Sequence, residues 1–590
     1  MKSKHQPPSS TLYTCIAMVQ DIFRDSTIGQ AINYISNGRI FPYTEQRPDF
    51  EVPPHFLLPS SQRPSTIVSP DSDATTLCGD LEKSTGTSTP GVQLTRESTL
   101  AVDIDAEKQK QIDAALSSDP YIVGWYGDDD QDNPRNWSPA KRAFVALSIS
   151  FLTFSVYIGS AIYTPAIPGL MAEFNVSQTT ATLGLTLYVL AYGIGPMFLA
   201  PLQELPGIGR NPVYMATLFL FVIFQVPVAV AKNMSTVLAF RFLTGFVGSP
   251  ALATGGASMA DIYSTHQFPY VLGIWALGAV AGPITGPVIG GFAAQANGWR
   301  WPQYELIWIA GFALIFLLLL LPETYEPTIL LKRAQRLRKL TGNQELRSQS
   351  EKDTEGESLG AVMHEALIRP FILAKEPVLM FANVYLGFVY AIFYLWFEAF
   401  PLVFTDIYHF NLGVSGLPFL GFVVSGAITY TVYVIYLKYH IAPRFAKATA
   451  AGVDIGPEIR LEIGLIASIF IPTSVLIFGF TSKESVHWIV PIIGAALYLP
   501  GIYLTFQSIL TYVTSAYPKY AASVLAGNDL FRSAIASVFP LFGRAFFVNL
   551  GLGPGSALLA GVSFLLMPVF WLLWKWGHVM RRRSVYAASP

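Results

Sequence analysis

Twelve long stretches of mainly apolar residues constrain the fold of this chain more than any other feature of its sequence. They lie at 143–167, 181–202, 212–231, 236–260, 268–294 and 303–321, and then at 377–402, 413–437, 463–480, 486–514, 522–548 and 555–577. About twenty apolar residues in an α-helix cross the roughly 30 Å of hydrocarbon in a bilayer, and a helix satisfies its own backbone hydrogen bonds there. The sequence therefore predicts an all-α membrane protein with twelve transmembrane helices.

The scarcity of charge supports a membrane protein over a soluble one. Charged residues make up 13% of the chain, whereas soluble domains carry about 25%. The formal net charge of -1 lacks the basic excess of a nucleic-acid-binding protein, so we expect no nucleic-acid partner. Both cysteines, Cys15 and Cys78, lie outside the apolar stretches, which excludes a disulfide framework.

A charged segment at 322–376 separates the sixth apolar stretch from the seventh. We therefore expect two six-helix bundles, at 141–321 and 377–577, joined by a central loop and followed by a short tail at 578–590. Lys and Arg gather before the first stretch, in the central loop, after the eighth stretch and at the C-terminus. Because cytoplasmic loops retain basic residues, both termini and the central loop are predicted to be cytosolic.

The N-terminal tail, 1–140, is polar and contains no stretch that could span a bilayer. Its segments Ser60–Ser72 and Ser84–Thr99 are too polar to bury a core, so we expect them to be disordered. Apolar residues at helical spacing in 16–35 predict a short amphipathic helix on the membrane or on the protein. A transient helix in a disordered tail is the equal alternative.

Several charged residues lie inside the apolar stretches, where each costs at least a few kcal/mol. Asp529 and Arg532 are three residues apart and share a helix face, which fits a structural ion pair or a role in handling substrate or protons. Glu398 is either functional or close enough to the outer surface to be hydrated. For Arg241 and Arg544, extension of the side chain to the membrane interface is the alternative to function.

The fifth stretch carries glycines every four residues, which form one flat helix face. They are Gly278, Gly282, Gly286 and Gly290, with Gly291 beside the last. Such a face lets another backbone approach closely. Pro283 and Pro287 remove backbone hydrogen bonds within the same run, so we expect a bent helix against a close-packed neighbour.

Two further groups of residues suggest local functions. Glu204, Gly209 and Arg210 lie in a tight turn after the second stretch, where an acid and a base could latch neighbouring helices together. The seventh and tenth stretches are rich in aromatic and polar side chains, for which we expect a polar-aromatic cavity, with lipid contact as the alternative for some. The candidates are Tyr390, Tyr394, Trp396, Phe397, Tyr503 and Gln507.

Together these residues resemble the major facilitator superfamily, and within it the fungal twelve-span drug:proton antiporters of the multidrug resistance type. The run from Gly278 to Gly291 is similar to the antiporter motif of that group throughout. The stretch around Arg241 resembles the motif whose arginine is implicated in proton coupling. Glu204, Gly209 and Arg210 resemble the cytosolic gate motif, although Glu204 replaces the usual aspartate and Pro201 the leading glycine.

The resemblance implies a proton-coupled antiporter that exports amphipathic drugs, toxins or secondary metabolites, with two bundles rocking around a central cavity. Proton coupling would fall to Arg241, Asp529 and Glu398, and Arg532 would join the aromatic residues of the cavity. We expect a monomer without cofactor or metal in the plasma membrane, with the vacuolar membrane as the alternative.

Two other functions remain to be weighed. Proton-coupled uptake of a sugar or polyamine would use the same fold, although the arginine-bearing signature of sugar porters after the sixth stretch is absent. A membrane enzyme is disfavoured because no histidine lies mid-span and no metal-ligand spacing, nucleophile motif or phosphate loop occurs.

Overall fold

The computed structural model describes residues 10–53, 56, 119, 121–264, 266–353, 355, 359–452 and 456–587. It comprises two compact units. The larger is formed by Met1–Phe41, Asp129–Ile329 and Gly356–Pro590, and the smaller by Pro42–Asp128 and Leu330–Glu355. The segments Ser60–Ser72 and Ser84–Thr99, for which disorder is expected, lie outside the described residues.

Twelve helical segments of the larger unit are long and apolar enough to cross a membrane, which confirms the expected number. The N-terminal half contains α5 (Pro139–Ala161), α6 (Ile167–Phe174), α7 (Gln178–Gln203), α8 (Arg210–Ala229), α9 (Met234–Ala253), α10 (Gly255–Ile262), α11 (Phe268–Asn297) and α12 (Trp301–Leu320). The C-terminal half contains α16 (Pro377–Phe400), α17 (Leu420–Tyr436), α18 (Ala442–Ala450), α19 (Glu462–Ser468), α20 (Phe470–Thr481), α21 (Ile489–Ala496), α22 (Tyr498–Ala516), α23 (Ala521–Leu550) and α24 (Leu552–Arg583).

Short helical turns extend several of these helices. They are η4 (Thr164–Ala166), η5 (Pro401–Ile407), η6 (Val414–Phe419), η7 (Leu437–Ile441), η8 (Pro457–Leu461) and η9 (Pro518–Tyr520). Because η5 continues α16, and η6 and η7 flank α17, the spans are longer than the regular helices alone. The helix α15 (Leu359–Leu373) precedes α16 and packs against α7 and α23.

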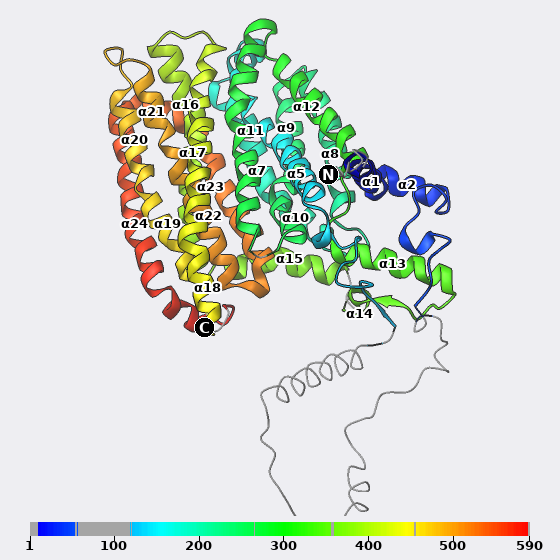
Figure 1. Ribbon diagram of the computed structural model, residues 1–590. Coiled ribbons are helices and arrows are strands. Elements are labelled where there is room, and N and C mark those ends of the chain that lie inside the picture. The colour runs from blue at the N-terminus through cyan, green and yellow to red at the C-terminus, as the bar shows by residue number, and fades with distance from the viewer. Residues whose placement is uncertain are drawn as a thin grey trace, which may run out of the picture. The chain divides into compact units, whose positions relative to one another are not determined.

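Helices pack closely against one another within each half. In the N-terminal half α5 lies against α11 and α7 against α9, while in the C-terminal half α16 lies against α23 and α20 against α24 (Figure 1). The two halves then meet along α7 and α23, and along α11 with α17 and η6. This seam between the halves contains the residues considered below.

The pattern of burial distinguishes the inner helices from the outer ones. The side chains of α5 and α16 are largely buried, whereas α12 and α17 expose large apolar side chains such as Phe312, Ile315, Val424 and Ile428. A helix that is apolar all round belongs in a membrane or in a protein core. The outer faces of α12 and α17 are therefore suited to contact lipid.

The segment for which an amphipathic helix is expected forms two helices, α1 (Ser10–Asp25) and α2 (Thr27–Ile35). Ser26 separates them, because its hydroxyl accepts a hydrogen bond from the backbone N–H of Gly29 at 3.1 Å and caps α2. Asp25 pairs with Lys141 of α5 at 3.1 Å. Burial opposes ionisation of Asp25, but Arg24 and Lys141 lower its pKa below the usual value.

The smaller unit joins part of the N-terminal tail to part of the central loop. Strand β1 (Ile122–Val123) pairs in parallel with β2 (Arg347–Ser348). Glu45, in the turn η1 (Thr44–Gln46), contacts Arg333 and Arg336 at 3.0 Å each. Both arginines lie on α13 (Glu326–Thr341), which is followed by α14 (Gln349–Asp353). A small apolar cluster completes this unit: Phe56, Val123, Ala334, Leu337 and Leu346.

Candidate functional site

Four tyrosine hydroxyls meet at the seam between the halves. Tyr192 of α7 lies 2.6 Å from Tyr390 and 3.0 Å from Tyr394, both on α16. Tyr157 of α5 contacts the hydroxyl of Tyr390. All four side chains are buried. We call this group the tyrosine cluster; it links the N-terminal half to the C-terminal half through hydrogen bonds at mid-span.

A buried ion pair lies beside the tyrosine cluster. Asp529 and Arg532 of α23 contact each other directly, and the Arg532 guanidinium lies 5.1 Å from the ring centroid of Tyr390 and 5.5 Å from that of Phe506. Asp529 Oδ2 and Arg532 Nε have no hydrogen-bond partner within the part of the chain that the structure describes. The pair therefore retains unused hydrogen-bonding capacity next to the seam.

The structure brings together four of the residues proposed from the sequence: Tyr390, Tyr394, Asp529 and Arg532. Tyr157 and Tyr192 complete the group and are not among the residues predicted from the sequence, because they lie outside the seventh and tenth stretches, where aromatic residues are concentrated. Their signal in the sequence is a tyrosine in the middle of an apolar span, where a hydroxyl needs a partner.

Of the other proposed cavity residues, Phe397 lies against the tyrosine cluster, with its ring centroid 5.5 Å from that of Tyr394, and the others lie elsewhere. Trp396 packs on Phe478, with ring centroids 4.7 Å apart, inside the C-terminal half, and Phe397 stacks on Phe419 at 5.3 Å. Tyr503 of α22 donates a hydrogen bond to the carbonyl of Gly273 on α11 at 3.0 Å. Gln507 is buried one turn further along α22. Their role in a cavity stays a prediction.

Glu398 lies near the end of α16 that is distant from the ion pair. Its side chain is 5% exposed and accepts a hydrogen bond from Gln178 of α7 at 3.3 Å. The hydrated position considered from the sequence is therefore wrong for this structure. Arg544 is partly exposed and pairs with Asp406 at 2.6 Å.

Arg241 is fully buried, with 0% exposure, so extension to the membrane interface is also wrong. Its guanidinium donates to the carbonyls of Gly159 at 2.7 Å and Gly184 at 3.0 Å. The rings of Tyr163 and Tyr188 lie 4.6 and 4.3 Å away. No carboxylate contacts it among the described residues.

The position of Arg241 has a clear physical reason. Gly159 lies in the last turn of α5, where helix carbonyls lack a donor within the helix. A cation at this end also interacts favourably with the helix dipole. Because Gly184 belongs to α7 and Arg241 to α9, one side chain ties three helices of the N-terminal half together.

Arg210, at the start of α8, pairs with Asp261 of α10 through Nε at 2.5 Å and Nη2 at 3.2 Å. A charged contact therefore joins α8 to α10 at this turn, with Asp261 rather than Glu204 as the acid paired with Arg210; Glu204 contributes its backbone carbonyl, which accepts from the Tyr325 hydroxyl at 3.1 Å. Asp261 is not among the candidate residues proposed from the sequence.

Glu323 completes this corner from the chain segment after α12. Its carboxylate accepts hydrogen bonds from the backbone N–H groups of Arg210 at 3.2 Å and Asn211 at 3.1 Å. It thus caps the N-terminus of α8 with a negative charge, as the helix dipole favours. Gly209 has a φ of +83°, and a Cβ there would lie 2.6 Å from the Glu323 carboxylate. Only glycine fits this turn.

The glycine face of α11 packs as expected. A Cβ at Gly282, Gly286 or Gly290 would lie 2.6–2.9 Å from backbone atoms of Ile158 and Ile162, at the end of α5. Gly278, nearest the start of the run, meets Ser150 more loosely, at 3.3 Å. The helix runs unbroken through Pro283 and Pro287.

Gly291 points in another direction. A Cβ there would lie 2.8 Å from the carbonyl of Leu412, in the C-terminal half. Nearby, Gln295 of α11 accepts a hydrogen bond from the Gly413 N–H at 2.8 Å. The helix α11 therefore uses Gly282, Gly286 and Gly290 within its own half and Gly291 at the seam.

Comparison with known proteins identifies the family. The family model "Major Facilitator Superfamily" matches residues 149–540. The chain is 43% identical to "Transporter mfs1" of Schizosaccharomyces pombe over 82% of this chain and 91% of that protein. It is 38% identical to "Cycloheximide resistance protein" of Candida maltosa, over 96% and 99% of the two chains, and 39% identical to "Fluconazole resistance protein 1" of Saccharomyces cerevisiae, over 80% and 85%.

A solved structure shares the fold. The human organic anion transporter MFSD10 (TETRAN) matches with a TM-score of 0.50 and 15% sequence identity, over 74% of this chain and 100% of that one. The twelve candidate spans in two halves agree with the matched family. The chain belongs to the major facilitator superfamily, and it is a multi-pass membrane transporter of small molecules rather than an enzyme.

Substitutions of the α11 glycines should have different effects on stability, depending on whether the glycine contacts α5 or the C-terminal half. Gly282→Leu and Gly286→Leu insert carbons against the α5 backbone, where overpacking costs about 1–3 kcal/mol. We expect both variants to insert into the membrane, melt at a lower temperature and lose transport. Gly291→Leu should lose transport with a smaller loss of stability, because its contact is with the other half.

The control is Gly311→Leu on α12, where a Cβ meets nothing within 4 Å. It should melt and transport like the wild type. Thermal melting of the purified variants and a transport assay check this set. Full transport by both single variants, Gly282→Leu and Gly286→Leu, would contradict the close packing of α11 on α5.

Proposed function

We propose that this transporter is a proton-coupled antiporter that exports amphipathic drugs, toxins or secondary metabolites. The names of two relatives, a cycloheximide and a fluconazole resistance protein, support this substrate class. The observation that carries the proposal is the Asp529–Arg532 ion pair, buried against the tyrosine cluster at the seam. A buried carboxylate beside the contact between two moving halves is suited to link a proton to that motion.

The proposed mechanism uses these residues in sequence. Ionised Asp529 holds Arg532 close to the ring of Tyr390. A proton on Asp529 removes the negative partner, so Arg532 is left against the tyrosine cluster and the hydrogen bonds that join the halves rearrange. Substrate held at the same seam then alters the proton affinity of Asp529, and the proton alters substrate affinity to the same degree. Glu398 and Arg241 are the other residues proposed for coupling.

The corner at Arg210, Asp261 and Glu323 is the proposed gate on the cytosolic side. It lies between α8, α10 and the end of α12, so its ion pair resists separation of these helices. The Tyr503 contact with Gly273 joins the two halves directly, and we propose that this contact breaks when the cavity opens. The glycine run of α11 remains the proposed antiporter element.

We further propose that both termini face the cytosol, that the protein resides in the plasma membrane and that it works as a monomer without a nucleic-acid partner. The support for the orientation is the distribution of Lys and Arg, which are concentrated around the start of α5, on α13 and in the last turns of α24.

A transport assay in proteoliposomes tests this function. A panel of toxic compounds in a pump-deleted yeast first identifies a substrate. With an imposed pH gradient and no ATP, we expect that substrate to move against the direction of proton flow. Movement in the same direction as protons would instead establish the uptake transporter, and movement that needs ATP would rule out the antiporter.

A further inference from the structure

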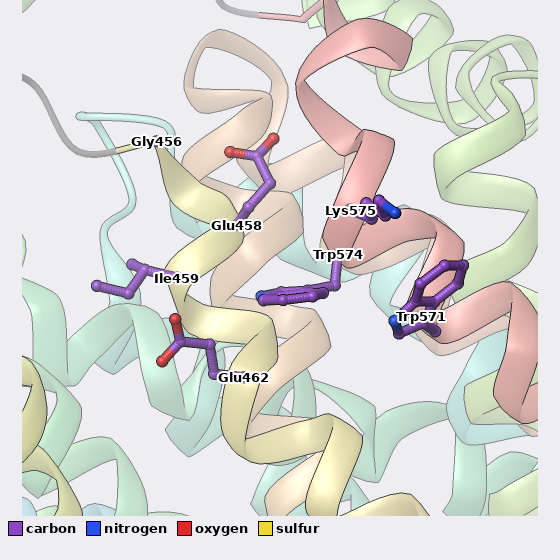
Figure 2. Close-up of a pocket in the computed structure, with 7 residues that line it drawn as sticks. All are labelled: Gly456, Glu458, Ile459, Glu462, Trp571, Trp574 and Lys575. Carbon is purple, nitrogen blue, oxygen red and sulfur yellow. The ribbon is translucent and has the colours of Figure 1, made fainter.

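An open pocket of about 540 Å³ lies between α24 and the η8–α19 segment, away from the seam. Trp571, Trp574 and Lys575 line it from α24, and Glu458 and Glu462 line it from η8 and α19. Figure 2 shows the ring of Trp574 extending from α24 toward the helix that bears both glutamates. None of these residues takes part in the proposed transport mechanism.

The depth of the pocket follows from helix geometry. At 1.5 Å per residue, Trp571 lies roughly 28 Å and Lys575 roughly 35 Å along α24 from Leu552. The hydrocarbon core of a bilayer is about 30 Å thick. With Leu552, the first residue of α24, at the opposite boundary of the hydrocarbon, Trp571 and Trp574 lie near the boundary on this side and Lys575 lies among the headgroups, at the depth where Trp is enriched in membrane proteins.

Both acidic side chains of the pocket have basic partners, whereas its lysine, Lys575, has no acidic partner within the described ranges. Glu458 accepts two hydrogen bonds from Arg581, at 2.9 and 3.1 Å. Glu462 accepts from Arg444 at 2.8 Å and lies 3.1 Å from His440. Lys575 contacts only aromatic rings, with its Nζ 4.9 Å from Trp571 and 5.6 Å from Trp576, and has no acidic partner within the described ranges.

The face of α24 that leads to the pocket is apolar and exposed. Phe564 and Pro568 precede Trp571 at helical spacing on the side of α24 that also bears Lys575, and Phe564 is 47% exposed. In a membrane this surface contacts acyl chains. A ligand with apolar chains along α24 and an anionic group at Lys575 matches both features, whereas a soluble anion would match only the lysine.

We propose that this pocket binds an anionic phospholipid of the leaflet that faces the C-terminus, of the phosphatidylserine class. The lipid phosphate lies at Lys575, the glycerol region lies against Trp571 and Trp574, and the acyl chains follow α24. The assignment of this leaflet as cytosolic rests on the proposed orientation; the binding itself does not.

Native mass spectrometry of the purified full-length protein, titrated with phosphatidylserine or phosphatidylcholine, tests the proposal. A basic residue near the surface contributes about 1 kcal/mol to the attraction of anionic lipid, which is roughly five-fold in affinity. We expect Lys575→Gln to lose this factor for phosphatidylserine and none for phosphatidylcholine. Lys575→Arg should retain the wild-type preference, which separates charge from folding.

Lys438→Gln is the matched control, because Lys438 also lies beside an exposed aromatic ring, 5.5 Å from Tyr439, but does not line the pocket. It should bind phosphatidylserine like the wild type. Trp574→Ala should weaken binding of both lipids, since it removes the glycerol contact.

Three results would overturn the proposal. Equal loss in Lys575→Gln and Lys438→Gln would indicate general surface charge. Competition by soluble glycerophosphoserine at the same concentration as the lipid would indicate a soluble anion. Unchanged binding in both Lys575→Gln and Trp574→Ala would place the lipid elsewhere. Because binding is measured without transport, none of these results depends on the antiporter mechanism.

Discussion

Replacing Arg241 with alanine is expected to abolish transport and to lower the melting temperature of the purified protein. The guanidinium holds the carbonyls of Gly159 and Gly184. A buried carbonyl left without a donor costs about 1–3 kcal/mol, and the vacated volume adds a cavity cost. The sequence predicts loss of efflux because of a coupling role; the structure adds that α5, α7 and α9 lose their common contact.

Arg241→Lys separates these effects. Lysine keeps the positive charge, but a single ammonium cannot reproduce the planar, multi-donor geometry of the guanidinium. We expect partial recovery of both stability and transport. Thermal melting and proteoliposome transport measure the two quantities on the same preparations.

Arg544→Ala is the control for removing an arginine from a span. Its pair with Asp406 is partly exposed, and exposed pairs are worth about 0–1 kcal/mol. This variant should melt close to the wild type and still transport. If Arg241→Ala instead melts like the wild type while losing transport, Arg241 acts in coupling alone. Its hydrogen bonds to the carbonyls of α5 and α7 then make no measurable contribution to stability.

Replacing Asp529 with asparagine is expected to remove the dependence of transport on the pH gradient. Asparagine keeps the shape and can still accept a hydrogen bond from Arg532, but it cannot take up and release a proton. Concentrative export in proteoliposomes should therefore be lost, while downhill exchange of substrate continues. Transport is measured at several imposed gradients, since a variant that is merely unstable would lose both activities.

Glu398→Gln serves as the matched comparison, because Glu398 is the other buried carboxylate proposed for coupling. Because Glu398 is also proposed for coupling, we expect Glu398→Gln to weaken the response to the gradient, and Asp529 as the main proton carrier predicts a larger loss in Asp529→Asn. The opposite pattern, a response lost in Glu398→Gln and kept in Asp529→Asn, would move the proton site to the Gln178 contact on α7. Equal responses in both variants would exclude either residue as the sole carrier.

Features set by local chain geometry were predictable. The twelve spans follow from the length of the apolar stretches, and the packing face of α11 follows from glycines four residues apart. Two of the four members of the tyrosine cluster were predictable for the same reason: Tyr390 and Tyr394 are four residues apart on one face of α16. Trp396 lies about 200° around the helix from Tyr394, so helical spacing separates it from that face. It was proposed for the cavity only because the seventh stretch is rich in aromatic residues.

Contacts between distant segments were not predictable in this way. Arg210 has an acid six residues before it, at Glu204, but pairs with Asp261, 51 residues later in the chain. The burial of Arg241 depends on carbonyls of two other helices, which no side-chain pattern reveals. Tyr157 and Tyr192 carry no charged neighbour in sequence, and their meeting with α16 is set only when the two halves come together.

The position of α1 and α2 has a consequence for how the chain is made. These helices are synthesised first, yet their contacts lie on segments made much later: Thr27 reaches Asn211 at 3.3 Å, and Ser26 bridges the backbone of Pro322, beyond the sixth span. The contacts of α1 and α2 with Asn211 and Pro322 can therefore form only after the third and sixth spans have been synthesised, so the complete binding surface for these two helices exists only once the N-terminal half has been made.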